Sequence, residues 1–224
     1  MSAYRPIPLP FERLPPDEMA RRARQFAETM ARRRTVRDFS PEPFPDQILR
    51  DAIAAASSAP SGAHQQPWVF VVVRDPELKR RLREAAEQEE KKLWEDRMSE
   101  EWRTALAPLG LDWHKPHLTD APALIVVFAQ PWRVEATPDG EKRVKHYYVD
   151  ESVGIAVGIL LAALHHAGLA TLTHTPSPMA FLRELLGRPA HERPYVLIPV
   201  GLPAAGALVP DLERKALTEV MIER

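Results

Sequence analysis

Apolar residues follow two different patterns along this chain. Segments 68–73 and 123–129 are apolar at nearly every position, which is typical of strands whose two faces are both covered. Segments 170–175 and 195–201 are two further strand candidates. The pattern therefore predicts a sheet built from a few buried strands.

Elsewhere, apolar residues recur every three or four positions, which is typical of helices. The predicted helices cover segments 17–34, 46–56, 75–103, 150–167 and 179–186. The helix at 150–167 is apolar nearly all round, and Gly154 and Gly158 allow another element to approach it closely, so we expect it at the centre of the fold. Helices that alternate with a few strands indicate an α/β or mixed α+β fold, in which a central mixed sheet is flanked by helices.

The length of 224 residues suits one globular domain with a sizeable core. Residues 1–16 form an arm spaced by prolines, with no period of its own, and we expect it to lie over a surface. Residues 17–224 show no repeat, low-complexity tract or linker. They are predicted to form a single domain.

Charge and cysteine content narrow the possible functions. The net charge is −1 with both signs interspersed, so neither nucleic acid nor an anionic membrane is an expected partner. The absence of cysteine excludes disulfides, thiolate metal sites, iron–sulfur clusters and a cysteine nucleophile. Any redox chemistry must then belong to a bound organic cofactor.

The first residues lack the basic start, apolar middle and small-residue cleavage site of a signal peptide. The longest apolar run, 153–164, is too short to span a bilayer and reads as part of a core helix. We therefore expect a cytoplasmic protein.

A loop of small residues precedes the first strand. Ser61, Gly62 and Ala63 carry almost no side chain, and Pro60 and Pro67 restrict the backbone on either side. A flat ring can lie against such a loop. An ordinary connection between a helix and a strand is the alternative interpretation.

Arginines cluster at the end of the first predicted helix. Arg33, Arg34 and Arg37, with Thr35 between them, offer the fork-shaped donors and hydroxyl that bind a phosphate. A basic helix end that complements its own dipole is the alternative. Glycine-rich dinucleotide and Walker loops are absent from the sequence, so the candidate ligand is a mononucleotide.

Other chemistries have weaker support. There is no His-Glu-x-x-His motif, and His165 and His166 lie on different faces of their helix, so no metal site is predicted. No Gly-x-Ser-x-Gly elbow occurs. Thr173 and Thr175 alternate in a predicted strand, where a hydroxyl can face a ligand or can simply be an ordinary strand side chain.

Several motifs together resemble the iodotyrosine deiodinase branch of the nitroreductase superfamily, in order from about residue 32 to the C-terminus. They are Arg-Arg-Thr-Val-Arg at 33–37, Ser-Gly-Ala-His-x-x-Pro-Trp at 61–68, the helix 151–164, the threonine strand 171–176, Gly-Arg-Pro-Ala-His-Glu at 187–192 and Pro-Asp-Leu-Glu-Arg-Lys at 210–215.

The resemblance implies an intertwined homodimer with FMN at the subunit interface, in which each C-terminal extension embraces the partner. The residues that match cofactor contacts are Arg33, Arg34, Thr35, Arg37, Ser61, Gly62, Thr173, His174, Thr175 and Arg214. In the family a threonine hydroxyl bonds N5 of the isoalloxazine and favours one-electron chemistry. Thr175 matches that role best and Thr173 is the second choice, although His174 between them departs from the family pattern.

The resemblance also implies a substrate lid over residues 76–118. Glu90, Trp94 and Lys115 match the residues that grip the zwitterion of an amino acid, with tryptophan in place of the family's tyrosine. Ala63 matches the residue whose amide meets the phenolate oxygen of the substrate. A solvated charged helix is the alternative interpretation of the lid.

The leading functional hypothesis is FMN-dependent reductive dehalogenation of halogenated tyrosines. The second hypothesis is a general FMN-dependent nitroreductase or quinone reductase. In either case NAD(P)H, directly or through a reductase, is the expected electron donor. The third is a flavin-binding module without turnover. Glu90 and Lys115 favour the first hypothesis, because a flat nitroaromatic needs no zwitterion clamp.

Overall fold

The computed structural model describes residues 4–138 and 140–224, which belong to two compact units that divide between Arg33 and Arg34. The first unit contains helix α1 (Pro16–Ala31), which begins with proline at its first position and has none of its residues buried. Its first turn carries Glu18, which pairs with Arg21 at 2.7 Å. The predicted helix 17–34 is therefore present and ends three residues earlier, at Ala31.

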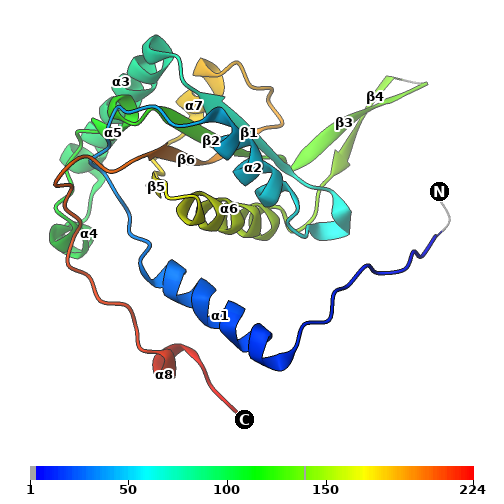
Figure 1. Ribbon diagram of the computed structural model, residues 1–224. Coiled ribbons are helices and arrows are strands. Elements are labelled where there is room, and N and C mark those ends of the chain that lie inside the picture. Colours follow the sequence, from blue (N-terminus) through cyan, green and yellow to red (C-terminus); the bar gives the residue numbers. More distant parts are fainter. Residues whose placement is uncertain (1–3, 139) are drawn as a thin grey trace. The chain divides into compact units, whose positions relative to one another are not determined.

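The second unit is built on a four-stranded sheet with the order β1-β2-β6-β5 (Figure 1). The strands are β1 (Trp68–Val73), β2 (Ala123–Ala129), β5 (Ala170–Thr171) and β6 (Arg193–Gly201). All three ladders are antiparallel. The sequence predicted a mixed sheet. Among the described residues, its parallel part is limited to an isolated bridge between Thr35 and Thr171.

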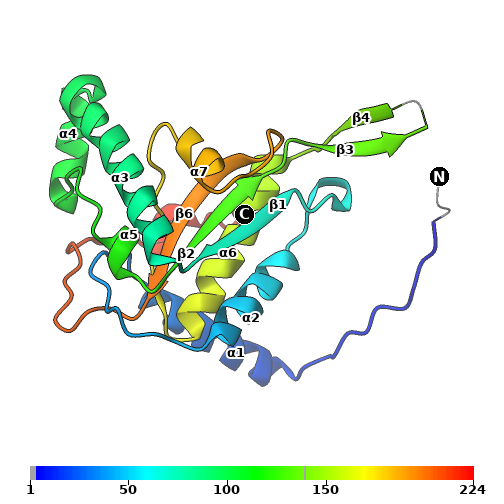
Figure 2. The same ribbon diagram turned by 90° about the horizontal axis from the view of Figure 1, so that it is seen from above.

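Helices cover both faces of this sheet, as Figures 1 and 2 show. On one face lie α2 (Asp46–Ser57) and α6 (Val149–His166), and on the other lie α3 (Pro76–Lys92), α5 (His117–Asp120) and α7 (Ala180–Leu185). Strand β2 is fully buried, and its residues alternate between the two cores: Ile125 and Val127 pack with α2 and α6, while Leu124 and Val126 face the other helices. The continuous apolar pattern of this strand follows from burial on both faces.

Helix α6 packs on α2 and β2, as expected for the central helix. By length and composition alone it is apolar enough to cross a membrane, and 33% of it is buried within this chain. Its exposed positions include Ile155 and Gly158, and a Cβ at Gly158 would meet no other atom within 4 Å. One apolar face of this core helix is therefore open in the single chain.

The predicted helix 75–103 is interrupted in the structure. Asp75 caps α3 by accepting from the amide of Leu78, and α3 ends at Lys92. A π-helical turn, η2 (Leu93–Arg97), follows, and Ser99 then caps the short helix α4 (Glu100–Leu106). A 3-10 turn, η3 (Ala107–Leu109), leads towards α5.

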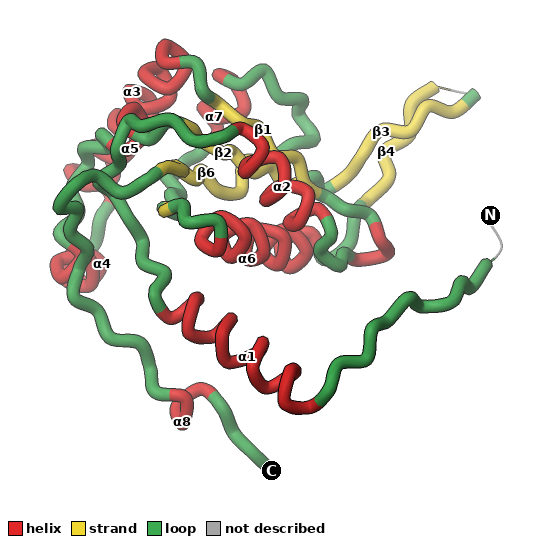
Figure 3. Tube along the Cα trace, viewed as in Figure 1, coloured by secondary structure: helices red, strands yellow, loops and turns green. Residues whose placement is uncertain are grey.

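Two features outside the sheet complete the second unit. A hairpin of β3 (Trp132–Thr137) and β4 (Gly140–Lys145) forms a separate two-stranded sheet. After β6 the chain continues as an extended segment that contains only the short helix α8 (Leu217–Val220), as Figure 3 shows by its colours. This C-terminal segment exposes Leu208, Leu212, Val220 and Ile222.

Candidate active site

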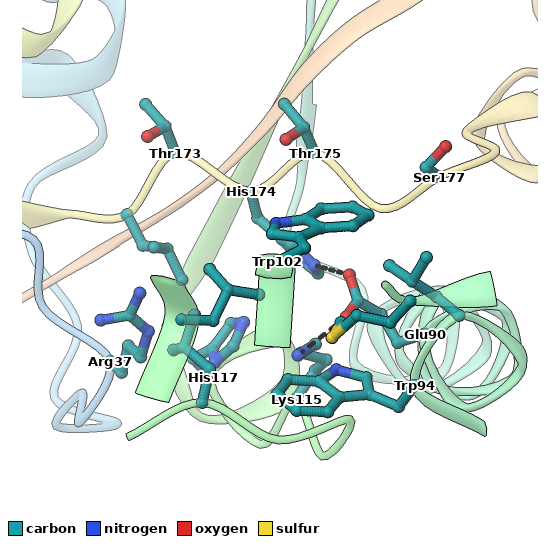
Figure 4. Close-up of a pocket in the computed structure, with 15 residues that line it drawn as sticks. Arg37, Glu90, Trp94, Trp102, Lys115, His117, Thr173, His174, Thr175 and Ser177 are labelled. Carbon is teal, nitrogen blue, oxygen red and sulfur yellow. Dashed lines mark hydrogen bonds and ion pairs between the residues drawn. The ribbon is translucent and has the colours of Figure 1, made fainter. Parts of the chain in front are cut away.

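A cavity of about 210 Å³ lies between the α3–α4 region and the segment that follows β5. Figure 4 shows its lining side chains, which come from elements far apart in the sequence. The cavity brings together these residues of the predicted site: Arg37, Glu90, Trp94, Lys115, Thr173, His174 and Thr175.

Glu90 and Lys115 form a buried ion pair at one side of the cavity. Oε2 of Glu90, in the last turn of α3, lies 3.3 Å from Nζ of Lys115, just before α5. Nζ of Lys115 also donates to the carbonyl of Asp112, and the amide of Lys115 donates to Glu87 at 2.7 Å. These additional bonds hold the lysine in place, as a buried charge requires.

His174 is the third member of this polar group. Its Nε2 lies 3.5 Å from Oε1 of Glu90, and both side chains are buried. In Figure 4 the His174 ring points into the cavity, while the side chains of Thr173 and Thr175 point to the opposite side of the segment. The side chain of His174 therefore faces Glu90, and its predicted cofactor contact stays a prediction.

His117, which sequence reasoning did not select, lies next to His174. The two rings meet edge to face with centroids 5.4 Å apart. Nε2 of His117 and Nδ1 of His174 are buried and have no hydrogen-bond partner in the part of the chain that the structure describes. Burial, with the positive charge of neighbouring side chains, lowers the pKa of His117 to about 3, so its ring is neutral at physiological pH.

The charges around Glu90 control its protonation. Burial alone raises the pKa of this carboxyl, but the hydrogen bond from His174 and the charge of Lys115 outweigh it, and the pKa is lowered. Burial lowers the pKa of His174 despite the opposing effect of Glu90. At neutral pH the group is therefore a carboxylate between an ammonium and a neutral imidazole.

Thr173 and Thr175 lie on an open edge. The backbones of Leu172 and His174 bond to Pro199 and Leu197 of β6, so Thr173 between them directs its backbone groups away from the sheet. Both threonine side chains are exposed. Their hydroxyls are accessible to a ligand that lies along this edge.

The segment after Arg33 runs beside β5. The amide of Val36 donates to Thr171 at 3.2 Å, and the guanidinium of Arg34 donates to the carbonyl of Pro210 in the C-terminal segment. Arg37 is half-buried, and burial lowers its pKa. Its guanidinium has no hydrogen bond or ion pair with residues 4–138 or 140–224. A cation held this way is suited to an anionic or polar ligand.

Arg33 belongs to the first unit, and Arg214 lies in the exposed C-terminal segment. Thr35 is held by its bridge to Thr171. The structure thus gives Thr35 and Arg37 defined positions on the second unit, next to the threonine edge.

The loop of small residues has a strained backbone. Ala63, His64 and Gln66 all have positive φ, at 49°, 54° and 48°, which is uncommon for residues other than glycine. Gly62 is required here, because a Cβ would lie 2.5 Å from the carbonyl oxygen of Tyr147.

Four amides of the loop have acceptors within the chain. The amides of Gly62 and Gln66 donate to Ser152 and Ser61, and those of His64 and Gln65 donate to carbonyls within the loop. The amide of Ala63 makes no bond to any described residue. It is available to an acceptor from outside the chain, such as an oxygen of a ligand.

The loop 61–63 and the Arg37 segment lie at opposite ends of the sheet. The loop leads into Trp68, which pairs with Ala129 at the end of β2, whereas Thr171 pairs with Val200 opposite the start of β2. A seven-residue strand is roughly 20 Å long. A single chain therefore does not bring the two parts of the predicted cofactor site together.

Known proteins resemble this chain over most of its length. The profile of the nitroreductase family matches residues 30–202. The iodotyrosine deiodinase of Haliscomenobacter hydrossis is 53% identical over 216 residues, which is 96% of each chain. Iodotyrosine deiodinase 1 of Homo sapiens is 46% identical over 217 residues, which cover 96% of this chain and 74% of the human protein.

Solved structures give the same picture. Oxidized iodotyrosine deiodinase bound to FMN and 3-iodo-L-tyrosine superimposes with a TM-score of 0.75 and 31% identity, covering 86% of this chain and 96% of the other. An FMN-bound nitroreductase from Bacteroides fragilis has a TM-score of 0.65 over 89% of this chain and 99% of its own. At 23% identity, this second likeness shows the fold alone.

Proposed function

The chain belongs to the nitroreductase family, within its iodotyrosine deiodinase branch, and from this membership and the cavity we propose that it removes halogen reductively from halogenated tyrosines, with FMN as its cofactor. The family, the α+β fold and the flavoenzyme class predicted from the motifs are confirmed.

The buried pair of Glu90 and Lys115 is the observation that carries the proposal. An amino acid brings an ammonium and a carboxylate, and the pair presents the complementary charges at 3.3 Å from each other. A zwitterion that enters the cavity is able to replace this internal ion pair with two charge-assisted hydrogen bonds. A flat aromatic ligand without these charges cannot supply charged partners for both Glu90 and Lys115.

The residues of the second unit fit FMN. Arg37 is a half-buried guanidinium without a partner in the described chain, and the exposed threonine edge lies near it. We propose that Arg33, Arg34, Thr35 and Arg214 hold the phosphate and ribityl chain together with Arg37. FMN, when bound, supplies the electrons that reduce the carbon–halogen bond. The hydroxyl of Thr175, or of Thr173, bonds N5 of the flavin in this proposal.

We infer that the functional unit is a homodimer, because the two parts of the flavin site are roughly 20 Å apart in one chain. In a dimer Ser61 and Gly62 of one chain complete the site around Arg37 of the other. The open apolar face of α6 and the exposed apolar residues of the C-terminal segment offer the surface for this association.

The substrate occupies the cavity with its amino acid end at Glu90 and Lys115. Trp94 lines the same cavity and supplies an aromatic surface, and its indole replaces a phenol as hydrogen-bond donor. The open amide of Ala63, contributed like Ser61 and Gly62 by the other chain of the proposed dimer, is the proposed donor to the phenolate oxygen. NAD(P)H, directly or through a reductase, remains the proposed electron source, and the cytoplasm the proposed location.

An anaerobic reoxidation experiment separates the candidate functions. The protein is loaded with FMN, the flavin is reduced, and diiodotyrosine or a nitroaromatic is added while flavin absorbance and iodide are followed. Rapid reoxidation with iodide release is expected for diiodotyrosine. Rapid reoxidation by the nitroaromatic alone would instead identify a general nitroreductase, and no reoxidation by either would indicate a flavin-binding module.

A further inference from the structure

The imidazole of His174 contacts Glu90 but has no part in the zwitterion clamp described above. We propose that His174 is a positioning residue for substrate recognition: it holds Oε1 of Glu90 so that Oε2 is directed towards the ammonium of the substrate. The inference rests on the proposed function of the same cavity. It adds a residue that decides how well the cavity selects an amino acid.

The distances indicate that the Glu90 carboxylate is oriented by its two neighbours but can still accept a further hydrogen bond. Charge-assisted hydrogen bonds between nitrogen and a carboxylate are usually about 2.7–2.9 Å long. Glu90 lies 3.3 Å from Lys115 and 3.5 Å from His174, so both contacts are longer than this. Its two oxygens therefore retain the capacity to accept from a third donor, which is what an incoming ammonium requires.

The His174 ring suits this task because it is neutral. A neutral imidazole carries one proton, and the facing carboxylate favours its location on Nε2. Nδ1 points away from Glu90 and is buried without a partner among residues 4–138 and 140–224. A neutral donor lowers the cost of burying Glu90 and brings no positive charge that would repel the ammonium of the substrate.

Removal of the ring would change the state of Glu90 before the substrate arrives. With His174 absent, Lys115 is the remaining donor to the carboxylate on the described residues of this cavity. The side chain of Glu90 is then free to turn further towards Lys115 and close the internal ion pair. Zwitterion binding would have to break a tighter pair, and it would weaken.

Protonation of the ring has a similar effect. The groups that face His174 are Glu90 from α3, Lys115 from the preceding loop, His117 from α5 and Arg37 from the segment beside β5. His117 stays neutral until about pH 3, and Lys115 and Arg37 are cations. On acidification His174 therefore becomes a cation that pairs with Glu90 and competes with the substrate ammonium, so affinity falls as pH falls.

Two substitutions test the inference by equilibrium binding to the FMN-loaded protein. His174→Leu removes the donor, and His174→Gln keeps an amide donor that does not titrate. Affinity is measured from flavin fluorescence for 3-iodo-L-tyrosine and for 2-iodophenol, which has no zwitterion. FMN content and the melting temperature of each variant verify folding.

The expected result is a selective loss. At about pH 8, His174→Leu should weaken iodotyrosine binding about tenfold and change iodophenol binding by less than about twofold, while His174→Gln stays close to wild type. Because burial lowers the pKa of His174 from its ordinary value of 6.5, the extra loss of wild-type affinity relative to His174→Gln should appear on acidification below pH 6.5. The phenol of the substrate titrates equally in both proteins, so the difference belongs to His174.

Three results overturn the inference. They are unchanged iodotyrosine binding in His174→Leu, equal losses for both ligands, and identical pH profiles for wild type and His174→Gln. A failure of the proposed function is recognised separately, in wild type: that protein would then bind iodophenol as tightly as iodotyrosine.

Discussion

Glu90 and Lys115 form a 3.3 Å ion pair whose side chains are only 12% and 9% exposed. A buried pair of this kind contributes little net stability, because desolvation offsets the attraction. Breaking it is costly, since one charge remains uncompensated. Its value is therefore greater for recognition than for folding.

The first prediction concerns this pair. Glu90→Gln and Lys115→Met should each weaken halotyrosine binding about tenfold to a hundredfold, because each removes one charge-assisted hydrogen bond to the zwitterion. Titration calorimetry on the FMN-loaded protein measures the effect. Glu95→Gln is the matched control, since Glu95 lies nearby in η2, is largely exposed and pairs with Lys91 at 3.8 Å.

A halophenol should bind wild type poorly and respond little to either change. Equal affinities of halophenol and halotyrosine for wild type would instead contradict the clamp and favour the general reductase.

The second prediction concerns Arg37. Arg37→Ala should raise the dissociation constant of FMN about tenfold or more, because a guanidinium that contacts a phosphate or ring oxygen supplies a strong hydrogen bond. The melting temperature of the protein without FMN should not fall, since Arg37 has no hydrogen bond or ion pair to lose on the described part of the chain. Flavin fluorescence and thermal melts are the measurements. Arg50→Ala, an exposed site that bonds to Gln47, is the control.

The third prediction concerns the threonine edge. Thr175→Ala should slow dehalogenation at least about tenfold and should slow nitroreduction less, because a hydroxyl at flavin N5 matters most for one-electron steps. Thr173→Ala is the comparison, as both side chains are exposed on the same side of the segment (Figure 4). Stopped-flow reoxidation with each substrate gives the ratio. If both reactions slow equally, the hydroxyl has no selective role.

Elements whose burial leaves a clear apolar pattern were predicted from the sequence more accurately than elements that depend on other contacts. The bounds of β1 and β2 agree with the predicted segments, because burial on both faces leaves a continuous apolar run. The strand expected at 170–175 is shorter in the structure, since β5 ends at Thr171, and beyond it Leu172 and His174 bond individually to β6. Residues 75–103 are highly charged, so the spacing of their apolar residues does not indicate that the helix ends at Lys92. Ser99 is a typical N-cap residue and could have indicated the start of α4.

In the candidate site too, some residues could be predicted from the sequence and others could not. Motifs identified Glu90 and Lys115, whose side chains meet in one cavity, and the threonines, whose segment lines that cavity while their side chains point away from it. The contact between His174 and His117 was not predictable, because it depends on how α5 packs beside the sheet. The sequence analysis did not predict the β3–β4 hairpin, although Pro138 and Gly140 are typical turn residues between two segments in which apolar and polar residues alternate.

The fourth prediction concerns acid stability and His117. Its pKa is about 3 in the folded chain and near 6.5 when unfolded, so between these values the unfolded state binds more protons. Stability should therefore fall with decreasing pH, by up to about 1.4 kcal/mol per pH unit between about pH 6 and pH 3 from this residue. His117→Leu should reduce that slope, as measured by urea unfolding at several pH values. His166→Leu, at an exposed site, is the control substitution.

The last prediction concerns the dimer. Ile155 is 46% exposed on α6, and the neighbouring Gly158 leaves open space beside it, so another helix can approach this face closely. If two copies meet there, Ile155→Glu places a charge in an apolar interface and should give a folded monomer. That monomer should bind FMN weakly, because Arg37 and the loop 61–63 of one chain lie at opposite ends of the sheet. Ile155→Ala, which removes bulk without adding charge, should remain a dimer and bind FMN. Analytical ultracentrifugation combined with flavin absorbance measures both properties on each sample, and a monomer of Ile155→Glu with full FMN affinity would show that one chain builds the site alone.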